Sequence, residues 1–423
     1  MLIIPIDTTL KRLACGIVVL ATLVWAAFAV VWGFANAAAS QAEFIEVADQ
    51  ALAISPGDPQ THYAAAVLLD RSFEAGDFDR ALTHYERAAE LAPNDHWLWL
   101  ELGRAYERRG DPAKAVAAMR YALALAPNYS AIQWTLGNTL LRQGNTDEAF
   151  ALIRSASAGD AKYTENAALL AWQMNAGNIN DVRRAVGDSV RLNAALAVLL
   201  ANEKRFDEAA GVWAAIPEAE KTGPVLDSGN RLLSQMLEAR RFRPAAGIAA
   251  QLGKASGNSF AVGNIFNGGF EQAVRPSGAQ AFDWQLDNGQ HPQIALTNGE
   301  KRTGNNSLVM IFNPSDRTGA ARGMTQLVAV RPGGRYTLSY QYKADLETAT
   351  TFRWAIKSAA DGSPIASGEP FKAKTDWTSA GFGFTVPENT DGVYVSFTRD
   401  ACNSGRCTVG GSLWLDDISL AGQ

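Results

Sequence analysis

Histidine and cysteine are the residue types of this sequence best suited to nucleophilic or metal chemistry, and both are scarce. The chain has four histidines, at positions 62, 84, 96 and 291, and three cysteines, at positions 15, 402 and 407. A zinc site or a cysteine nucleophile needs several such side chains close together, and these are widely scattered. Pairs of carboxylates can be chosen from any chain with 43 acidic residues, so they identify no glycosidase site. We expect a protein that is not an enzyme.

Cys402 and Cys407 are the exception to this scatter, because only four residues separate them. Outside the cytoplasm, two cysteines at this spacing form a disulfide that closes a hairpin. The prediction of a disulfide therefore depends on the compartment in which the C-terminal half lies.

The N-terminal segment predicts that compartment. Residues 13–35 carry no charge, and 23 helical residues at about 1.5 Å each are enough to cross a hydrocarbon core of about 30 Å. Lys11 and Arg12 precede this segment, and acidic residues follow it at positions 43, 46 and 49. The positive-inside rule then keeps residues 1–12 in the cytoplasm and places the bulk of the chain in the periplasm, anchored to the inner membrane by one transmembrane helix.

A cleaved signal peptide is the alternative for this segment. The small residues around Ala37 fit a cleavage site, but the apolar region of a signal peptide spans only about 7 to 15 residues. The uncharged run here is longer, which favours an anchor. The outward topology is the same in both cases.

Length and composition indicate a folded chain of two to three domains. The sequence has 423 residues, of which 47% are hydrophobic and 19% charged. Its 38 basic and 43 acidic residues are spread over both halves, so neither half is basic enough for a nucleic-acid partner. Near residue 256, alanine-rich sequence of helical periodicity gives way to glycine, threonine and alternating apolar residues. We expect one domain over 44–255 and a second over 263–423.

A repeat of 34 residues runs through the first of these domains. The repeat is best defined at Trp99, Leu102, Gly103, Tyr106, Ala115, Met119, Ala122 and Pro127. In type, order and spacing these residues resemble the tetratricopeptide repeat (TPR), with Met119 where an aromatic residue is usual. The resemblance implies an α-solenoid of five or six helix hairpins, in which small side chains let the paired helices approach closely.

If the resemblance holds, the first helix of each hairpin lines a groove that binds a protein partner. The matching positions are Asp70, Arg104, Arg108, Trp134, Asn138 and Arg142. Arginines one turn or one repeat apart could grip a peptide that bears carboxylates. The alternatives are a solvated charged face and a packing role for Trp134. His62 and His96, which begin consecutive repeats, are expected on the surface.

The second domain shows strand-like alternation in seven segments. These segments are residues 306–312, 324–330, 335–343, 351–357, 380–386, 393–399 and 412–420. Turn residues separate them and no helical pattern intervenes, which predicts an antiparallel β-sandwich.

A second resemblance covers about residues 265–420. It rests on Asn267-Gly268-Gly269-Phe270-Glu271, on Trp284, Gly304 and Ser307-Leu308, on the run 331–340, on Trp377, and on the closing run 414–420. These segments are similar to the jelly-roll carbohydrate-binding modules of the family 4/9 type, in the galactose-binding-like group. The resemblance implies a structural Ca²⁺ held by Glu271 and by Asp416 or Asp417, since Ca²⁺ prefers hard oxygen ligands. An acidic pair on the surface is the alternative.

Alternation along residues 335–343 predicts which side chains face a ligand. Tyr336, Leu338, Tyr340 and Tyr342 form the core face, and the polar side chains between them face outward. The expected glycan-binding residues are Gln341, Lys343, Arg353, Lys357 and Tyr394 on outward positions and Trp284 and Trp377 near loops, although aromatic residues of a sandwich more often lie in its core.

These observations predict a non-catalytic envelope scaffold. Its solenoid would bind a protein partner and its sandwich a glycan, in the assembly or export of a cell-surface polysaccharide. The alternative is a purely structural subunit of an envelope or secretion complex that binds no glycan, and a hydrolase would require turnover of a polysaccharide.

Overall fold

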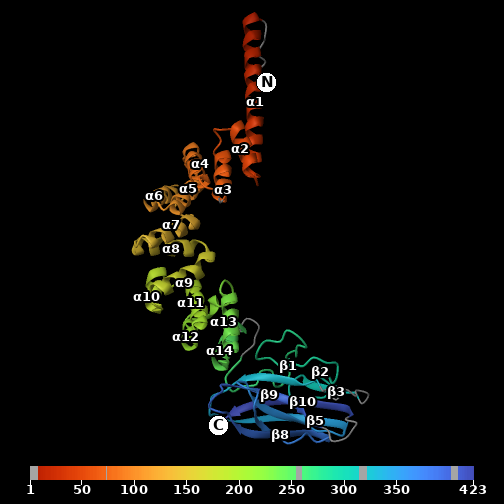
Figure 1. Cartoon of the computed structure of the whole chain (residues 1–423). Helices are drawn as coiled ribbons and strands as arrows, with labels where there is room; N and C mark the ends of the chain where they lie inside the picture. The colour runs from red at the N-terminus through yellow and green to blue at the C-terminus, as the bar shows by residue number, and fades with distance from the viewer. Residues whose placement is uncertain (1–7, 73, 254–259, 314–321, 402–407) are drawn as a thin grey trace. The chain divides into compact units, whose positions relative to one another are not determined.

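The computed structural model describes residues 8–72, 74–253, 260–313, 322–401 and 408–423, and it divides into two compact units, Met1–Asp188 and Ser189–Gln423. Helices come first along the chain and strands last (Figure 1). An array of helix pairs followed by an antiparallel two-sheet sandwich confirms the predicted fold class. The pair Cys402 and Cys407 lies outside the described residues.

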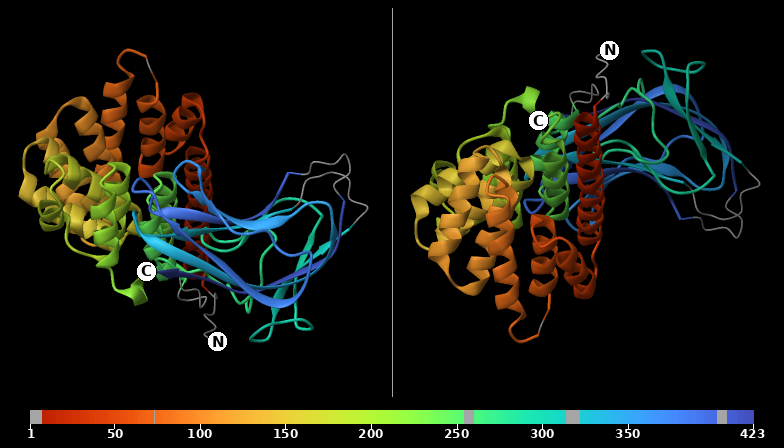
Figure 2. Two further views of the ribbon diagram at one scale, coloured as in Figure 1. Left: turned by 90° about the horizontal axis from the view of Figure 1, so that it is seen from below. Right: turned by 90° about the horizontal axis from the view of Figure 1, so that it is seen from above.

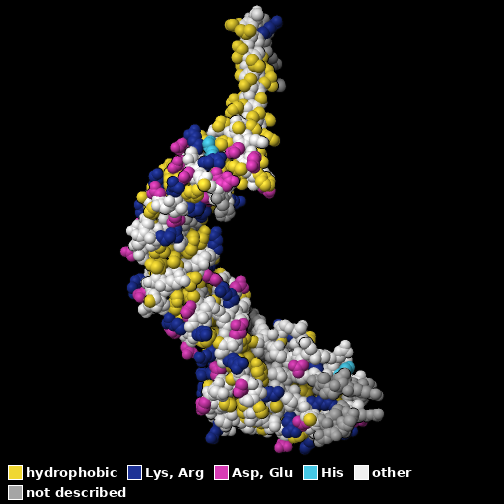
Figure 3. All heavy atoms as spheres, viewed as in Figure 1, with side chains coloured by type: hydrophobic (Ala, Val, Ile, Leu, Met, Phe, Trp, Pro, Cys, Tyr) yellow, Lys and Arg dark blue, Asp and Glu magenta, His cyan; other side chains and the backbone are white. Residues whose placement is uncertain are grey.

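Helix α1, Thr9–Ser40, contains the predicted membrane segment. By length and composition it is the described helix that could cross a membrane, a test that a signal sequence also passes. Hydrophobic side chains cover much of its surface (Figure 3). Its last turns are different, because Ala35 and Ala39 are 0% and 3% exposed. Ala39 belongs to a small core of alanines that helices α2 and α3 complete.

The remaining helices of the first unit are short and follow one another closely. They are α2 Ile45–Ile54, α3 Pro59–Asp70, α4 Asp77–Leu91, α5 His96–Arg109, α6 Pro112–Leu125, α7 Ser130–Arg142, α8 Thr146–Gly159, α9 Thr164–Met174 and α10 Ile179–Val186, with a 3-10 turn η1 at Ala161–Tyr163. The second unit continues with α11 Val190–Asn202, α12 Phe206–Ala214, η2 Glu218–Glu220, α13 Leu226–Glu238 and α14 Phe242–Gly253. Consecutive helices from α3 to α14 pack as six pairs.

The repeated small residues explain the close packing within a pair. A Cβ atom added at Gly103 of α5 would lie 2.6 Å from Cγ of Met119 on α6. Ala115 and Ala122 of α6 are fully buried. Close packing of the paired helices is therefore the correct reason for the small residues.

Neighbouring residues also determine where α6 begins. The carboxylate of Asp111 accepts the N–H of Lys114, and Pro112 occupies the first turn of the helix.

The sandwich consists of two five-stranded sheets, which lie in two layers (Figure 2). Sheet 1 has the order β1-β4-β9-β6-β7 and sheet 2 the order β2-β3-β10-β5-β8. The strands are β1 Gln285–Leu286, β2 Gln293–Thr297, β3 Ser307–Phe312, β4 Met324–Ala329, β5 Arg335–Thr348, β6 Phe352–Ser358, β7 Pro364–Ser367, β8 Lys374–Thr385, β9 Gly392–Arg399 and β10 Val409–Gly422. All seven predicted segments are strands, whereas β1, β2 and β7 were not predicted.

Side chains from both sheets fill the space between them. Tyr336, Leu338, Tyr340 and Tyr342 of β5 are all buried, as the alternation predicts. Trp354 of β6 is fully buried and its ring packs against that of Trp284 at 5.7 Å between centres. The outer faces of the two sheets therefore carry the polar side chains.

Candidate functional site

The predicted groove positions lie on α3, α5 and α7, the first helices of three successive pairs in the first unit. Two of the arginines form ion pairs across neighbouring first helices. Arg108 of α5 lies 2.7 Å from Asp70 of α3, and Arg142 of α7 contacts Glu107 of α5. Charged residues of adjacent repeats thus form ion pairs, and the Nε and Nη2 groups of Arg142 both donate to the Glu107 carboxylate.

Arg104 is paired within its own helix and also reaches the next repeat. Its Nη1 lies 2.7 Å from Glu101, and its Nη2 donates to the Thr135 hydroxyl on α7 at 3.2 Å. The guanidinium also lies 5.8 Å from the centre of the Trp97 ring. A guanidinium has five N–H donors, so donors remain for a ligand after these contacts.

Trp134 and Asn138 of α7 also have partners within the first unit. The Trp134 ring stacks on Tyr163, with centres 5.0 Å apart and planes at 20°. The Asn138 amide donates to the Trp134 carbonyl at 2.8 Å. The structure therefore brings the six predicted positions onto one set of helices, each with an intramolecular partner.

The predicted glycan-binding residues are divided between the two outer faces of the sandwich. Gln341 and Lys343 project from β5 of sheet 2. The register between β5 and β8 shifts next to Lys343, and Trp377 lies at this shift on β8. Arg353, Lys357 and Tyr394 belong to sheet 1, where Lys357 and Tyr394 are paired in register. One ligand cannot contact both outer faces at once.

Trp284 lies on neither face. Its side chain is 2% exposed, and its indole N–H donates to the Asn267 carbonyl at 3.2 Å. It thus packs in the core, the role that aromatic residues of a sandwich more often have. On sheet 1, Arg353 is also engaged, since its guanidinium forms an ion pair with Asp400 at 2.6 Å.

Sheet 2 carries a constellation that the sequence prediction missed. Lys343 lies 3.0 Å from Glu300, 3.7 Å from Asp376 and 5.8 Å from the centre of the Trp414 ring. The hydrogen bond to Glu300 is the main cause that raises the pKa of Lys343. Trp414 belongs to β10, the central strand of sheet 2, and is half-buried. An indole face, an ammonium and two carboxylates can together stack a sugar ring and bond its hydroxyls.

A β-bulge explains why Trp414 was missed. Strict alternation places Trp414, Asp416 and Ile418 on one side, but the register of β10 shifts between Asp416 and Ser419. Leu415 and Asp416 are therefore both buried, while Trp414 pairs with the outward Lys343. The available sequence signal was that apolar residues, Leu413 and Leu415, flank Trp414 on both sides.

The three predicted Ca²⁺ ligands meet at one loop, residues 300–306. Glu271 accepts the N–H groups of Asn305 and Asn306 at 2.7 and 3.1 Å. The fully buried Asp416 accepts those of Arg302 and Thr303 at 2.8 and 3.1 Å. These bonds tie the opening segment and the last strand to the same loop.

Asp417 completes the loop contacts, because its carboxylate accepts the Thr303 hydroxyl at 2.6 Å. Burial raises the pKa of Asp416, although three backbone N–H groups favour its charged form. Among the described residues, no three His, Cys, Asp or Glu side chains are grouped closely enough to hold a metal ion. The carboxylates face N–H and O–H donors in this arrangement, and the Ca²⁺ site stays a prediction.

Comparison with known proteins gives a family match within the helical part of the chain. The family model of the tetratricopeptide repeat matches residues 68–130 and 100–164. No curated protein matches the chain. Among solved structures, "CBM4 structure and function" is 15% identical, covers 38% of this chain and 99% of that chain, and has a TM-score of 0.29.

Two further solved structures are similar at the same level. "Family 16 Carbohydrate Binding Module-2" is 19% identical over 32% of this chain and 89% of that chain, with a TM-score of 0.25. "Crystal structure of YrrB: a TPR protein with an unusual peptide-binding site" is 18% identical over 50% of this chain and 92% of that chain, with a TM-score of 0.27. Scores this low carry no conclusion about function. The helical part of the chain carries tetratricopeptide repeats, over residues 68–164.

Proposed function

We propose that this protein is a non-catalytic, membrane-anchored scaffold that binds a protein partner through its repeats and a glycan through the outer face of sheet 2. The observation that carries the glycan proposal is the outward Trp414 beside Lys343 and its two carboxylate partners. Exposed aromatic faces next to hydrogen-bonding groups suit sugar rings, which have apolar faces and polar edges. Such a scaffold would hold an assembly near a polysaccharide during its synthesis or export.

The membrane proposal is supported by how α1 ends. Asn36 donates to the carboxylate of Asp58 at 2.8 Å, Ala35 is fully buried, and Ala39 packs against alanines of α2 and α3. Cleavage around Ala37 would remove part of this packed structure. We therefore infer that α1 is retained as the anchor, with residues after it on the periplasmic side. An intact N-terminus on protein extracted from membranes would agree, and a mature chain that starts near residue 38 would contradict it.

The repeats would bind their partner through α3, α5 and α7. The guanidinium groups of Arg104, Arg108 and Arg142 keep donors beyond those used in their ion pairs. A carboxylate-bearing segment of a partner can bond these donors or displace an internal acid. Arg142–Glu107 is the most exposed of these pairs, with side chains 59% and 27% exposed, so displacing Glu107 costs only about 0–1 kcal/mol.

A glycan array with the detergent-solubilised full chain tests the sugar site. Trp414→Ala should weaken binding about two- to tenfold, because stacking on an aromatic ring is worth about 0.5–1.5 kcal/mol. Tyr394→Ala is the matched control, since it removes a half-buried aromatic ring from sheet 1. The absence of any bound glycan would favour a purely structural subunit, and equal loss in both variants would contradict a site on the outer face of sheet 2.

A further inference from the structure

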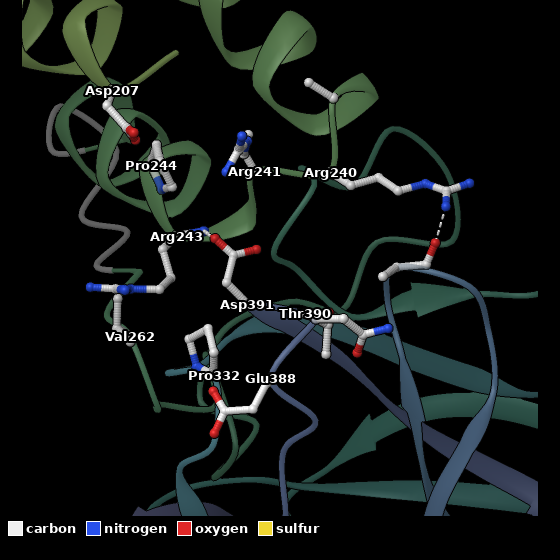
Figure 4. A pocket seen from close by; sticks show the side chains of 13 residues that line it. Asp207, Arg240, Arg241, Arg243, Pro244, Val262, Pro332, Glu388, Thr390 and Asp391 are labelled. Atoms are coloured by element: carbon white, nitrogen blue, oxygen red, sulfur yellow. Dashed lines mark hydrogen bonds between the residues drawn. The ribbon is translucent and has the colours of Figure 1, made fainter. Parts of the chain in front are cut away.

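A polar cleft lies within the unit Ser189–Gln423, between the α13–α14 pair and the sandwich (Figure 4). Its volume is about 800 Å³, within the range of roughly 300–1,000 Å³ that is usual for ligand sites. Arg240, Arg241 and Arg243 line it from the helical side. Glu388 and Asn389 line it from the segment between β8 and β9.

The two walls of this cleft are joined by specific contacts. Both carboxylate oxygens of Asp391 accept backbone N–H groups at the start of α14, from Phe242 and Arg243, each at 3.0 Å. Next to it, a Cβ atom at Gly392 would lie 2.5 Å from the Phe242 ring, so the backbone packs directly on that side chain. Both carboxylate oxygens of Asp391 thus cap α14, and these hydrogen bonds attach the helix to the segment that precedes β9.

The arginines of the cleft differ from others in the same unit. Arg205 and Arg353 each form an ion pair with a carboxylate, at 2.6 Å. In the part of the chain that the structure describes, the three cleft arginines form no such pair. Arg240 donates to the Ala360 carbonyl, and Arg241 lies 5.7 Å from the centre of the Phe206 ring. The guanidinium groups of Arg241 and Arg243 therefore keep their capacity to bind a carboxylate.

We propose that this cleft binds a sugar that bears a carboxylate, such as a uronic acid residue of an acidic polysaccharide. Arg241 and Arg243 would bond the carboxylate, while Glu388 and Asn389 accept hydrogen bonds from ring hydroxyls. A sugar chain whose units each combine one carboxylate with several hydroxyls fits a cleft lined by three arginines and by the carboxylates of Asp207, Glu388 and Asp391. An acidic peptide fits less well, because it offers carboxylates without ring hydroxyls that could donate to Glu388 and Asn389.

This site is separate from the outer face of sheet 2, and titration of the full chain with trigalacturonic acid tests it. We expect saturable binding that Arg241→Gln with Arg243→Gln weakens at least tenfold. Arg191→Gln is the matched control, because Arg191 is exposed on α11 of the same unit and does not line the cleft. The methyl ester of the same trisaccharide, which lacks the charges, should also bind at least tenfold more weakly.

Several results would overturn the proposal. They are the absence of trigalacturonate binding, equal binding of the acid and its ester, unchanged binding in the double variant, and equally tight binding of triglutamate. Trp414→Ala should leave trigalacturonate binding at this cleft unchanged. A failure of the sheet 2 site would therefore be distinguishable from a failure of this one.

Discussion

The Nδ1 atom of His62 on α3 lies 3.0 Å from the Nδ1 atom of His84 on α4. The Nε2 atom of His62 lies 3.0 Å from the Pro56 carbonyl, which can only accept a hydrogen bond. His62 therefore carries its proton on Nε2, and His84 donates from Nδ1 to the bare Nδ1 of His62. His62 is 9% exposed, so the prediction of a surface histidine at the start of this repeat is wrong.

These two histidines predict that the α3–α4 helix pair loses stability in acid. Burial is the main cause that lowers the pKa of both His62 and His84 below the ordinary value of 6.5. As pH falls below about 6.5, the unfolded chain binds protons before the folded chain does, so the free energy of unfolding falls until the folded pKa values are reached. Thermal unfolding followed by circular dichroism at pH 7.5 and 5.5 measures the loss.

His84→Gln supplies the control for this pH effect, because glutamine keeps a donor but does not titrate. The variant should lose less of its unfolding temperature between the two pH values than the wild-type chain. An identical loss in both proteins would show that other groups cause the acid sensitivity.

Gly268 predicts a sharp intolerance in the opening segment of the sandwich. A Cβ atom at Gly268 would lie 1.8 Å from the Ile418 carbonyl oxygen, and no contact of that length is tolerated. The N–H of Ile418 donates to the Gly268 carbonyl at 2.9 Å, so the two backbones are held together. Gly268→Ala should destabilise the sandwich by about 1–3 kcal/mol or more.

The neighbouring glycine is a matched control for this substitution. At Gly269 the nearest atoms to an added Cβ are carboxylate oxygens 4.0 Å away, which is ordinary contact. Gly269→Ala should therefore change the denaturation midpoint far less than Gly268→Ala. Equal midpoints for the two variants would contradict the close approach of Gly268 to the last strand.

Asn36 predicts that the end of α1 contributes to the stability of the repeats. Its amide bonds the carboxylate of Asp58, which is 1% exposed. Asn36→Ala leaves a buried acceptor without this donor, which costs about 1–3 kcal/mol. Ser40→Ala is the control, because the Ser40 hydroxyl is exposed and bonds the local Ala37 carbonyl. Limited proteolysis of α2 and α3 should accelerate in the first variant and not in the second.

The sequence predicted the elements better than the contacts between them. Gly103 and Ala115 indicate a repeat, because close packing of the paired helices admits only small side chains at these positions. The constraint acts on residue type, so it is visible in the sequence. The order of β10 within sheet 2 is set by partners distant along the chain, so the neighbourhood of Trp414 and Lys343 was not visible. One bulge at Asp416 was enough to move Trp414 to the outer face. The placement of Arg353 and Lys343 on different sheets also follows from strand order, which depends on partners distant along the chain.

Arg142 predicts how the repeats recognise a partner. Arg142→Glu places a negative charge beside Glu107, which should abolish capture of a carboxylate-bearing partner in a crosslinking pull-down. The fold should survive, because the Arg142 side chain is 59% exposed and exposed ion pairs are worth about 0–1 kcal/mol.

Arg120 gives a control of the same kind on the second helices. It lies on α6 and pairs with Glu148 of α8 at 2.9 Å, so Arg120→Glu breaks an equivalent ion pair away from α5 and α7. Capture lost in the Arg142 variant and kept in the Arg120 variant would locate the binding surface on the first helices. Capture lost equally in both would mean that the partner senses the net charge of the repeats, and capture kept in both would remove Arg142 from the binding surface.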